Sequence, residues 1–243
     1  MSKITVVGIG PGCGPMMTYQ AVQALEAADV IVGYTVYLDL LGERFAGKEF
    51  LSTPMKQEAL RCRMCFEEAD KGRDVAMVCS GDAGIYGMAS LMFEMKEELG
   101  STAEIAVVPG ITAASSGAAL LGAPVNHDFC VISLSDLLTP WELIEKRLRA
   151  AAQGDFAVVL YNPSSKKRHD HLMKACDILM ETASPDTACG YVRNIGREGE
   201  EYHTCTLGEL RDTSVDMFTT VFIGNSQSRI LGGRLITPRG YDL

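Results

Sequence analysis

Three glycine-containing segments carry the residue types best suited to holding a small ligand. They are Gly8–Gly12 (GIGPG), Ser80–Gly87 (SGDAGIYG) and Val108–Ala114 (VPGITAA). Glycine has no Cβ, so the backbone can turn sharply and its N–H and C=O groups can approach a ligand closely. The free backbone groups of the second segment suit the polar end of an amino-acid ligand. Each segment lies at the end of an apolar run, so we expect all three at the carboxyl ends of strands, where open α/β sheets bind ligands.

The spacing of these glycines excludes two common nucleotide sites. Pro11 lies between the second and third glycines of the first segment, and Gly12 comes one residue too early for the G-x-G-x-x-G pattern of dinucleotide-binding folds. The G-K-[ST] sequence of a phosphate-binding P-loop does not follow either. Each segment also has a plain structural alternative: a tight turn for the first, a helix N-cap at Asp82 for the second, and a capped helix start for the third.

The elements that must position these segments alternate between strand and helix. Continuous apolar runs indicate strands buried on both faces, as in a parallel sheet. In the first half, the expected strands are Ile4–Gly8, Val30–Gly33, Asp74–Cys79 and Glu104–Val108. Helices are expected after a cap at Thr18, near Ile85–Glu98, and after Gly110.

The second half has more strands and less helix between them, which indicates a mixed sheet. Its expected strands are Cys130–Ser135, Phe156–Tyr161, Thr187–Val192, Tyr202–Thr206, Thr219–Gly224 and Arg234–Thr237, with helices over Trp141–Ala152 and Lys166–Thr182. The small residues of 117–124 indicate a link between two domains. We therefore predict an α/β protein with a mostly parallel N-terminal domain, 1–118, and a mixed-sheet C-terminal domain, 119–243.

Composition narrows the function. The net charge is −9, which argues against nucleic acid as a partner because phosphate binding needs a positive surface. No run of about 18 apolar residues occurs, so no membrane span is expected. The amino terminus lacks the pattern of a signal peptide, so we expect a cytoplasmic protein.

The cysteines and histidines do not indicate a metal site. The eight cysteines are scattered, which is typical of reduced thiols in a cytoplasmic protein. Cys62 and Cys65 have a metal-like spacing, but a second pair is missing. His169 and His171 would point to different faces of a helix, which makes them a poor chelating pair.

In their order along the chain, the three glycine segments resemble the tetrapyrrole methylase family, and the resemblance covers the whole chain. Further segments are similar to the C-17 methyltransferase branch of that family, which acts on precorrin-3B. They are Val32–Tyr37 (VGYTVY), Cys130–Trp141 (CVISLSDLLTPW), Val158–Ser164 (VVLYNPS), Asn194–Glu200 (NIGREGE), Thr220–Ser226 (TVFIGNS) and Thr237–Tyr241 (TPRGY).

The resemblance implies a specific activity and architecture. It implies S-adenosylmethionine-dependent C-methylation of a corrin precursor, precorrin-3B or cobalt-factor III, at C-17, with ring contraction, in cobalamin biosynthesis. It also implies the two-domain tetrapyrrole methylase fold with the cofactor in the cleft between the domains, and a homodimer. Alternatives are a methylase for another ring position (C-11 or C-20), diphthine synthase, a tetrapyrrole-binding protein without catalysis, and an NAD-dependent dehydrogenase.

Site residues follow from the matching motif positions. The expected cofactor-binding residues are Pro11, Ser80, Gly81, Asp82, Ile85, Thr112, Ala113, Tyr161, Asn162, Thr204, Thr219 and Thr220. The expected substrate-binding residues are Gly10, Gly12, Arg61, Lys166, Arg193 and Arg197.

Basic side chains should meet the substrate's carboxylates, for which arginine offers a bidentate fork. Lys167 and Arg168 adjoin Lys166 and belong to the same basic stretch. No catalytic residue is assigned: Asp82, Asp136 and Glu198 are open candidates for a general base, each with a plain structural alternative.

Overall fold

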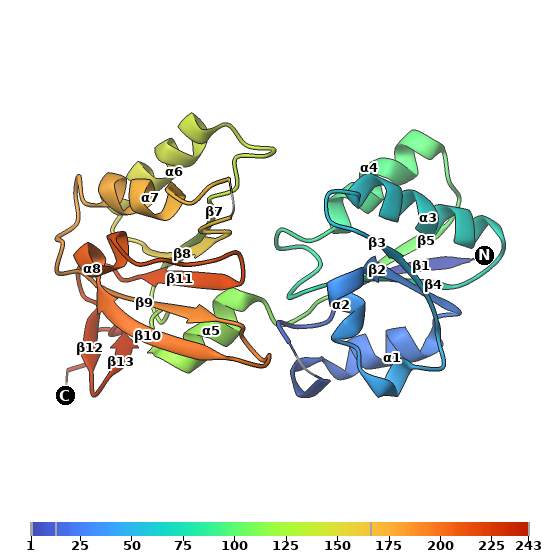
Figure 1. Cartoon of the computed structure of the whole chain (residues 1–243), viewed down its shortest axis with the longest axis horizontal. Coiled ribbons are helices and arrows are strands. Elements are labelled where there is room, and N and C mark those ends of the chain that lie inside the picture. The colour runs from blue at the N-terminus through green and yellow to red at the C-terminus, as the bar shows by residue number, and fades with distance from the viewer. Residues whose placement is uncertain (1, 13, 166, 243) are drawn as a thin grey trace. The chain divides into compact units, whose positions relative to one another are not determined.

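The chain forms two compact units, Met1–Ala113 and Ala114–Leu243, which Figure 1 shows in blue to green and in green to red. The computed structural model describes every residue except 1, 13, 166 and 243. The domain boundary expected at 118 falls inside helix α5 (Ala113–Leu121).

Unit 1 is built on a parallel five-stranded sheet with the order β3-β2-β4-β1-β5. The strands are β1 (Lys3–Gly8), β2 (Val30–Tyr34), β3 (Glu49–Thr53), β4 (Val75–Cys79) and β5 (Glu104–Val108). This confirms the parallel sheet predicted from the apolar runs. The edge strand β3 was not predicted, because most of its residues are exposed and it therefore lacks a continuous apolar run.

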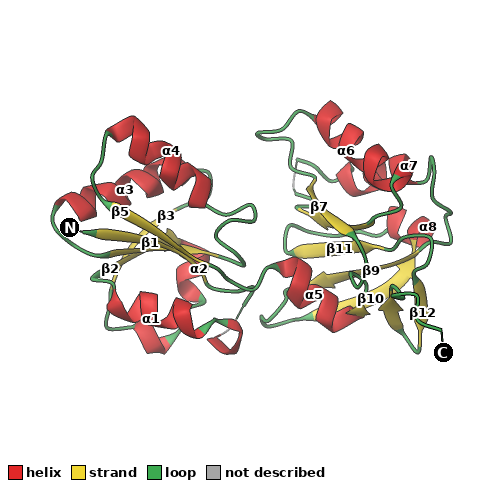
Figure 2. Cartoon of the chain, turned by 180° about the vertical axis from the view of Figure 1, so that it is seen from behind, coloured by secondary structure: helices red, strands yellow, loops and turns green. Residues whose placement is uncertain are grey.

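Helices cover both faces of this sheet (Figure 2). They are α1 (Tyr19–Ala27), α2 (Thr35–Asp39), α3 (Glu58–Asp70) and α4 (Ala89–Leu99). One core joins α3 and α4 to side chains such as Val6 and Met77, and a second joins α1 to Val7 and Val78 on the opposite face. The predicted cap of α1 is confirmed: Thr18 Oγ1 accepts a hydrogen bond of 3.0 Å from the Ala21 N–H.

Unit 2 contains the mixed sheet that was predicted, with the order β10-β9-β11-β8-β7. Its strands are β7 (Phe129–Ser133), β8 (Ala157–Tyr161), β9 (Ala188–Arg193), β10 (Glu201–Thr206) and β11 (Thr219–Ile223). Strands β7 and β8 are parallel, and the other neighbours are antiparallel. A small second sheet joins β12 (Arg229–Leu231), β13 (Arg234–Ile236) and β6 (Gly122–Ala123).

The helices of unit 2 lie on opposite faces of the five-stranded sheet. Helix α5 packs on one face, while α6 (Trp141–Gln153), α7 (His171–Leu179) and α8 (Leu207–Arg211) share the apolar core of the other (Figures 1 and 2). Helix α7 begins at His171, later than expected; the expected start, Lys166, lies outside the described residues. Before the helix, the backbones of Ser165 and Arg168 bond each other.

Gly117 allows α5 to approach the sheet closely. A Cβ at this position would lie 2.8 Å from the Phe222 ring and 3.2 Å from Ile195 Cδ1. Phe222 is almost completely buried on β11, so its ring has little room to move. The helix therefore depends on a residue without a side chain at this contact.

We expect Gly117→Ala to lower the free energy of unfolding by about 1–3 kcal/mol through overpacking, although alanine normally favours a helix. Gly208→Ala in α8 is the matched control, since a Cβ there would have its nearest contact at 3.5 Å and should be neutral or slightly stabilising. Chemical denaturation of both variants tests this. A Gly117→Ala protein as stable as the wild type would contradict the close contact.

Candidate functional site

The first two glycine segments follow β1 and β4, which are neighbours in the sheet of unit 1, and β5 lies on the other side of β1. Parallel neighbours end at the same edge, so the loops after these strands lie side by side. Gly10 and Gly81 exchange two backbone hydrogen bonds: the Gly10 N–H donates to Gly81 O at 3.1 Å, and the Gly81 N–H donates to Gly10 O at 2.7 Å. Both residues have positive φ, which favours glycine at these positions.

Asp82 ties the third segment to the second. Its Oδ2 accepts a hydrogen bond of 2.9 Å from the Gly110 N–H, and its Oδ1 accepts bonds from the N–H groups of Gly84 (2.8 Å) and Ile85 (3.1 Å). Both carboxylate oxygens thus hold backbone groups of the loops. This gives Asp82 a clear structural role, but not as the N-cap of α4, which begins only at Ala89 after the turn of 83–88.

The three backbones approach so closely that side chains cannot fit between them. A Cβ on Gly110 would lie 2.0 Å from Gly81 O and 2.6 Å from the carbonyl carbon of Gly8. A Cβ on Gly8 would lie 2.6 Å from the Gly110 nitrogen. These contacts involve backbone atoms only, so no side-chain rotation can relieve them. The three segments therefore form one interlocked unit, which we call the glycine junction (Gly8, Gly81 and Gly110).

The surface beside the glycine junction combines polar backbone with exposed apolar side chains. Ile85, Tyr86 and Ile111 are 40%, 56% and 38% exposed. Ser80 and Thr112 are half-buried, and Pro11 is buried. Such a surface offers polar contacts to an amino-acid end and apolar contacts to a flat ring.

Two of the expected cofactor residues of unit 2, Tyr161 and Asn162, lie at the carboxyl end of β8. Tyr161 Oη accepts a hydrogen bond of 2.6 Å from the Ala114 N–H, which anchors the first turn of α5. Asn162 has a positive φ of 54°, and its Nδ2 donates to Ser133 Oγ at 3.0 Å. Ser133 was missed by sequence reasoning, although it ends the strand that pairs with β8.

The three expected threonines do not point the same way. Thr204 on β10 and Phe222 on β11 are both paired with Gly190 on β9, so their side chains lie on the same face of the sheet. This is the face covered by α5, because Phe222 contacts Gly117. Thr220 lies on that same face because it is two residues before Phe222. Thr219 points to the other face, where its hydroxyl donates to Asp216 Oδ1 at 3.0 Å.

The basic residues expected to bind substrate have different environments. Arg61 is only 4% exposed: its Nε donates to Thr53 Oγ1 at 2.9 Å and its Nη2 to Pro54 O at 3.2 Å. Arg193 pairs with Asp216 at 2.8 Å and Glu201 at 3.4 Å.

The other residues expected to bind substrate, Gly10, Gly12, Arg197 and Lys166, share no common environment. Gly10 and Gly12 are buried in the first segment. The guanidinium of Arg197 lies 5.8 Å above the ring of Phe218. Lys166 lies outside the described residues. Binding of substrate by this set therefore stays a prediction.

Comparison with known proteins decides the family. The family described as Tetrapyrrole (Corrin/Porphyrin) Methylases matches residues 3–211. The chain belongs to the tetrapyrrole methylase family. It is therefore an S-adenosylmethionine-dependent methyltransferase.

Individual relatives and one crystal structure agree with this membership. A probable cobalt-factor III C(17)-methyltransferase of Salmonella typhimurium is 46% identical over 240 residues, which are 99% of this chain and 100% of that protein. A precorrin-3B C(17)-methyltransferase of Sinorhizobium sp is 38% identical, with 97% and 96% of the two chains covered. The crystal structure of the methyltransferase CobJ matches with a TM-score of 0.90 at 39% identity, covering 98% of this chain and 100% of that one.

The cysteines of this methylase are mostly buried thiols. Burial raises the pKa of Cys62 from 9.0 to about 12 and that of Cys79 to about 11, and it raises the pKa of Cys65 well above 9.0. Within the described part of the chain, no three His, Cys, Asp or Glu residues are grouped so as to hold a metal ion. Among the same residues, no helix is long and apolar enough to cross a membrane.

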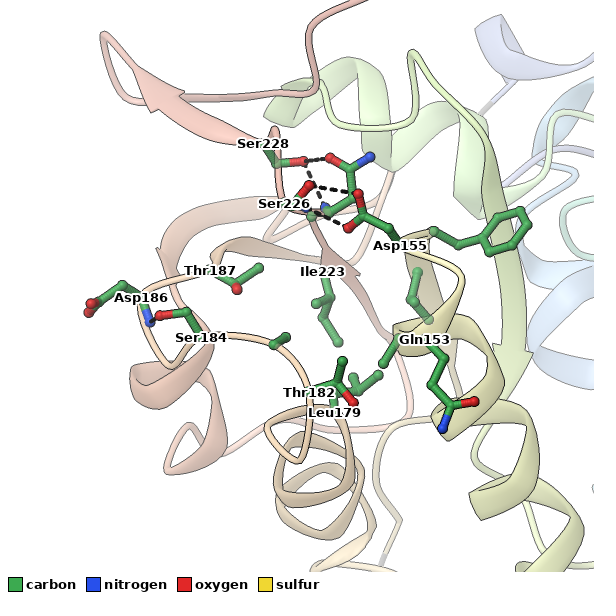
Figure 3. Close-up of a pocket in the computed structure, with 16 residues that line it drawn as sticks. Gln153, Asp155, Leu179, Thr182, Ser184, Asp186, Thr187, Ile223, Ser226 and Ser228 are labelled. Carbon is green, nitrogen blue, oxygen red and sulfur yellow. Dashed lines mark hydrogen bonds between the residues drawn. The ribbon is translucent and has the colours of Figure 1, made fainter.

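A pocket of about 540 Å³ lies by the amino ends of β8 and β9, at the opposite end of these strands from Tyr161 (Figure 3). Asp155 lines it, but this carboxylate already accepts hydrogen bonds from the backbone N–H (2.8 Å) and hydroxyl (2.6 Å) of Ser226. Ser228 and Asn225 likewise bond each other. None of the residues that line the pocket belongs to the set expected to bind cofactor, so the two are separate.

We expect Gly110→Ala to weaken binding of S-adenosylhomocysteine at least about tenfold, because the added Cβ forces the glycine junction apart. Gly47→Ala is the matched control, since a Cβ there has nothing within 4 Å. Calorimetric titration of both variants provides the measurement. An affinity of Gly110→Ala within about twofold of the wild type would show that the junction does not shape the cofactor site.

The free energy of unfolding should fall as the pH rises from about 9 to about 12. Over this window the unfolded chain loses the Cys62 proton while the folded protein retains it, so deprotonation favours unfolding. Denaturation at several pH values should show a shallower fall for Cys62→Ala, which removes this thiol and no other ionisable group. An identical slope in variant and wild type would contradict the raised pKa.

Proposed function

We propose that this methylase transfers a methyl group to C-17 of cobalt-factor III or precorrin-3B in cobalamin biosynthesis. The observation that carries the proposal is the full-length likeness to C(17)-methyltransferases, at 46% identity to the Salmonella typhimurium protein and with a TM-score of 0.90 to CobJ. The cobalt-factor III relative has the higher identity, 46% against 38%, which favours the cobalt-containing substrate.

The residues of unit 1 are proposed to hold the cofactor through their backbone. When bound, S-adenosylmethionine supplies a methyl group already activated on a sulfonium sulfur. The glycine junction fixes the backbone groups around Ser80 and Gly81, and Ile85 offers an apolar contact. Because these loops hold one another, they need little reordering when a ligand arrives. The remaining cofactor residues expected in unit 1 are Pro11, Asp82, Thr112 and Ala113.

From unit 2 we propose that Tyr161, Asn162, Thr204 and Thr220 take part in the same binding. Tyr161 and Asn162 are fixed by their hydrogen bonds to Ala114 and Ser133. Thr219 is the weakest member of the expected set, because its hydroxyl is engaged with Asp216 on the other face.

The chemistry asks mainly for position. The nucleophile is an electron-rich carbon of the substrate ring, so the protein needs no serine or cysteine nucleophile. Holding that carbon in line with the methyl group, away from water, can supply up to about 7–11 kcal/mol of the barrier reduction. Ring contraction, a homodimeric assembly and a cytoplasmic location complete the proposal, on the basis of the family resemblance.

Substrate recognition must overcome the protein's own charge. Corrin precursors carry many carboxylates, whereas the chain has a net charge of −9. Long-range repulsion is screened within about 8 Å at physiological salt, so local arginines decide binding. Arg193 and Arg197 are the proposed residues in the 193–200 segment.

Incubation with S-adenosylmethionine labelled with ¹³C in its methyl group should give a product whose single new methyl is bonded to C-17, as seen by two-dimensional NMR. Both cobalt-factor III and precorrin-3B are offered, and the cobalt-containing substrate should be used faster. Micromolar binding of S-adenosylhomocysteine, without binding of NADH, accompanies this result. Label at another ring carbon would replace the C-17 assignment with that position.

A further inference from the structure

Arg168 lies in the loop that joins β8 to α7, and its side chain is only 15% exposed. A buried guanidinium normally has most of its five N–H donors satisfied. Among the described residues, the guanidinium of Arg168 has a single hydrogen-bond partner, Asp136, whose Oδ1 is 3.4 Å from Nη1. Its Nε is fully buried and has no partner among those residues. Arg168 is therefore a buried cation whose bonding capacity is largely unused.

Asp136 is held between Arg168 and His171. Nδ1 of His171 lies 2.8 Å from the carbonyl oxygen of Leu134, which can only accept, so Nδ1 carries the proton. Nε2 of the same ring faces Asp136 Oδ2 at 3.8 Å. The Trp141 ring packs against His171 with 4.5 Å between ring centroids. The Leu134 and Trp141 contacts fix the orientation of the His171 ring beside Asp136. The Asp136 carboxylate in turn contacts one side of the guanidinium, at Nη1 of Arg168.

This group, which we call the Arg168 cluster (Asp136, Arg168 and His171), lies at the edge of the sheet where ligands bind in such folds. Asp136 follows β7 and Arg168 follows β8, and these strands are parallel neighbours whose carboxyl ends coincide. The two loops are joined further where the Leu134 N–H donates to Tyr161 O at 2.9 Å. Tyr161 belongs to the proposed cofactor residues of unit 2, so the cluster adjoins them.

We propose that Arg168 binds a carboxylate on the periphery of the tetrapyrrole substrate, with Asp136 and His171 as positioning residues. Asp136 occupies Nη1, which leaves the edge formed by Nε and Nη2. That edge has the planar two-donor geometry that matches a carboxylate. Because Nε is covered in this structure, a substrate carboxylate would reach it only after the Arg168 side chain turns this edge outward, and it would then give Nε the acceptor that it lacks. The inference rests on the proposed function, because it assigns a residue to that substrate.

Charge supports an anionic partner at this point. Arg168 carries one positive charge and shares it with one carboxylate at a long hydrogen-bond distance of 3.4 Å. Lys174, the next cation along α7, is already paired with Asp170 at 2.6 Å. An incoming carboxylate therefore finds its strongest unsatisfied donors on Arg168.

The test compares Arg168→Gln and Arg168→Lys with Arg147→Gln, in which an exposed arginine of α6 is changed in the same way. Binding of cobalt-factor III is followed by its absorption spectrum, and binding of S-adenosylhomocysteine by calorimetry. We expect Arg168→Gln to weaken tetrapyrrole binding at least about tenfold while cofactor affinity stays unchanged, which also shows that the variant is folded. Arg168→Lys should recover only part of the loss, and Arg147→Gln should behave as the wild type.

A second readout observes the proposed bond directly. In ¹⁵N-labelled protein, the Nε–Hε NMR signal of Arg168, assigned by its loss in Arg168→Lys, should shift downfield when cobalt-factor III binds. An unshifted signal, or tetrapyrrole affinity of Arg168→Gln within about twofold of the wild type, would overturn the inference while leaving the proposed function intact. Failure of the wild type itself to bind the tetrapyrrole would overturn both.

Discussion

The close approach of three backbones at the glycine junction is the constraint on which the site in unit 1 depends. Parallel pairing of β4, β1 and β5 brings the loops to one edge, but pairing alone does not join them. Gly10 and Gly81 join two of them by reciprocal hydrogen bonds, and Asp82 joins the third through Gly110. The surface proposed to bind the cofactor is thus made of main chain held by main chain, with one carboxylate as the connecting group.

Much of the architecture could be predicted from the sequence, because buried strands leave a strong signal. The runs that became β1, β2, β4 and β5 are continuous and apolar, and both predicted sheet types were confirmed. The edge strand β3 left no such signal because its residues are mostly exposed. The start of α4 was placed four residues too early, since the turn at 83–88 contains apolar residues that also suit a helix.

The site was only partly predictable, for a different reason. Residue types identified the loops, but hydrogen-bond partners depend on long-range packing. Asp82 was weighed as a cofactor contact, a base or a helix cap, and the sequence did not show that its Oδ2 bonds a loop that lies 28 residues away in the chain. Arg61 was expected to bind substrate, and the sequence gave no sign that α3 would place its guanidinium against Thr53. His171 was considered only as a metal ligand, because nothing in the sequence links it to Asp136.

The protonated thiols of unit 1 have a consequence for a protein proposed to handle cobalt. Thiolates are strong, soft ligands for transition metals, whereas thiols bind them weakly. Burial keeps Cys62, Cys65 and Cys79 as thiols across the physiological pH range. Under the proposed function, a cobalt ion carried by the substrate therefore meets no thiolate ligand from these residues.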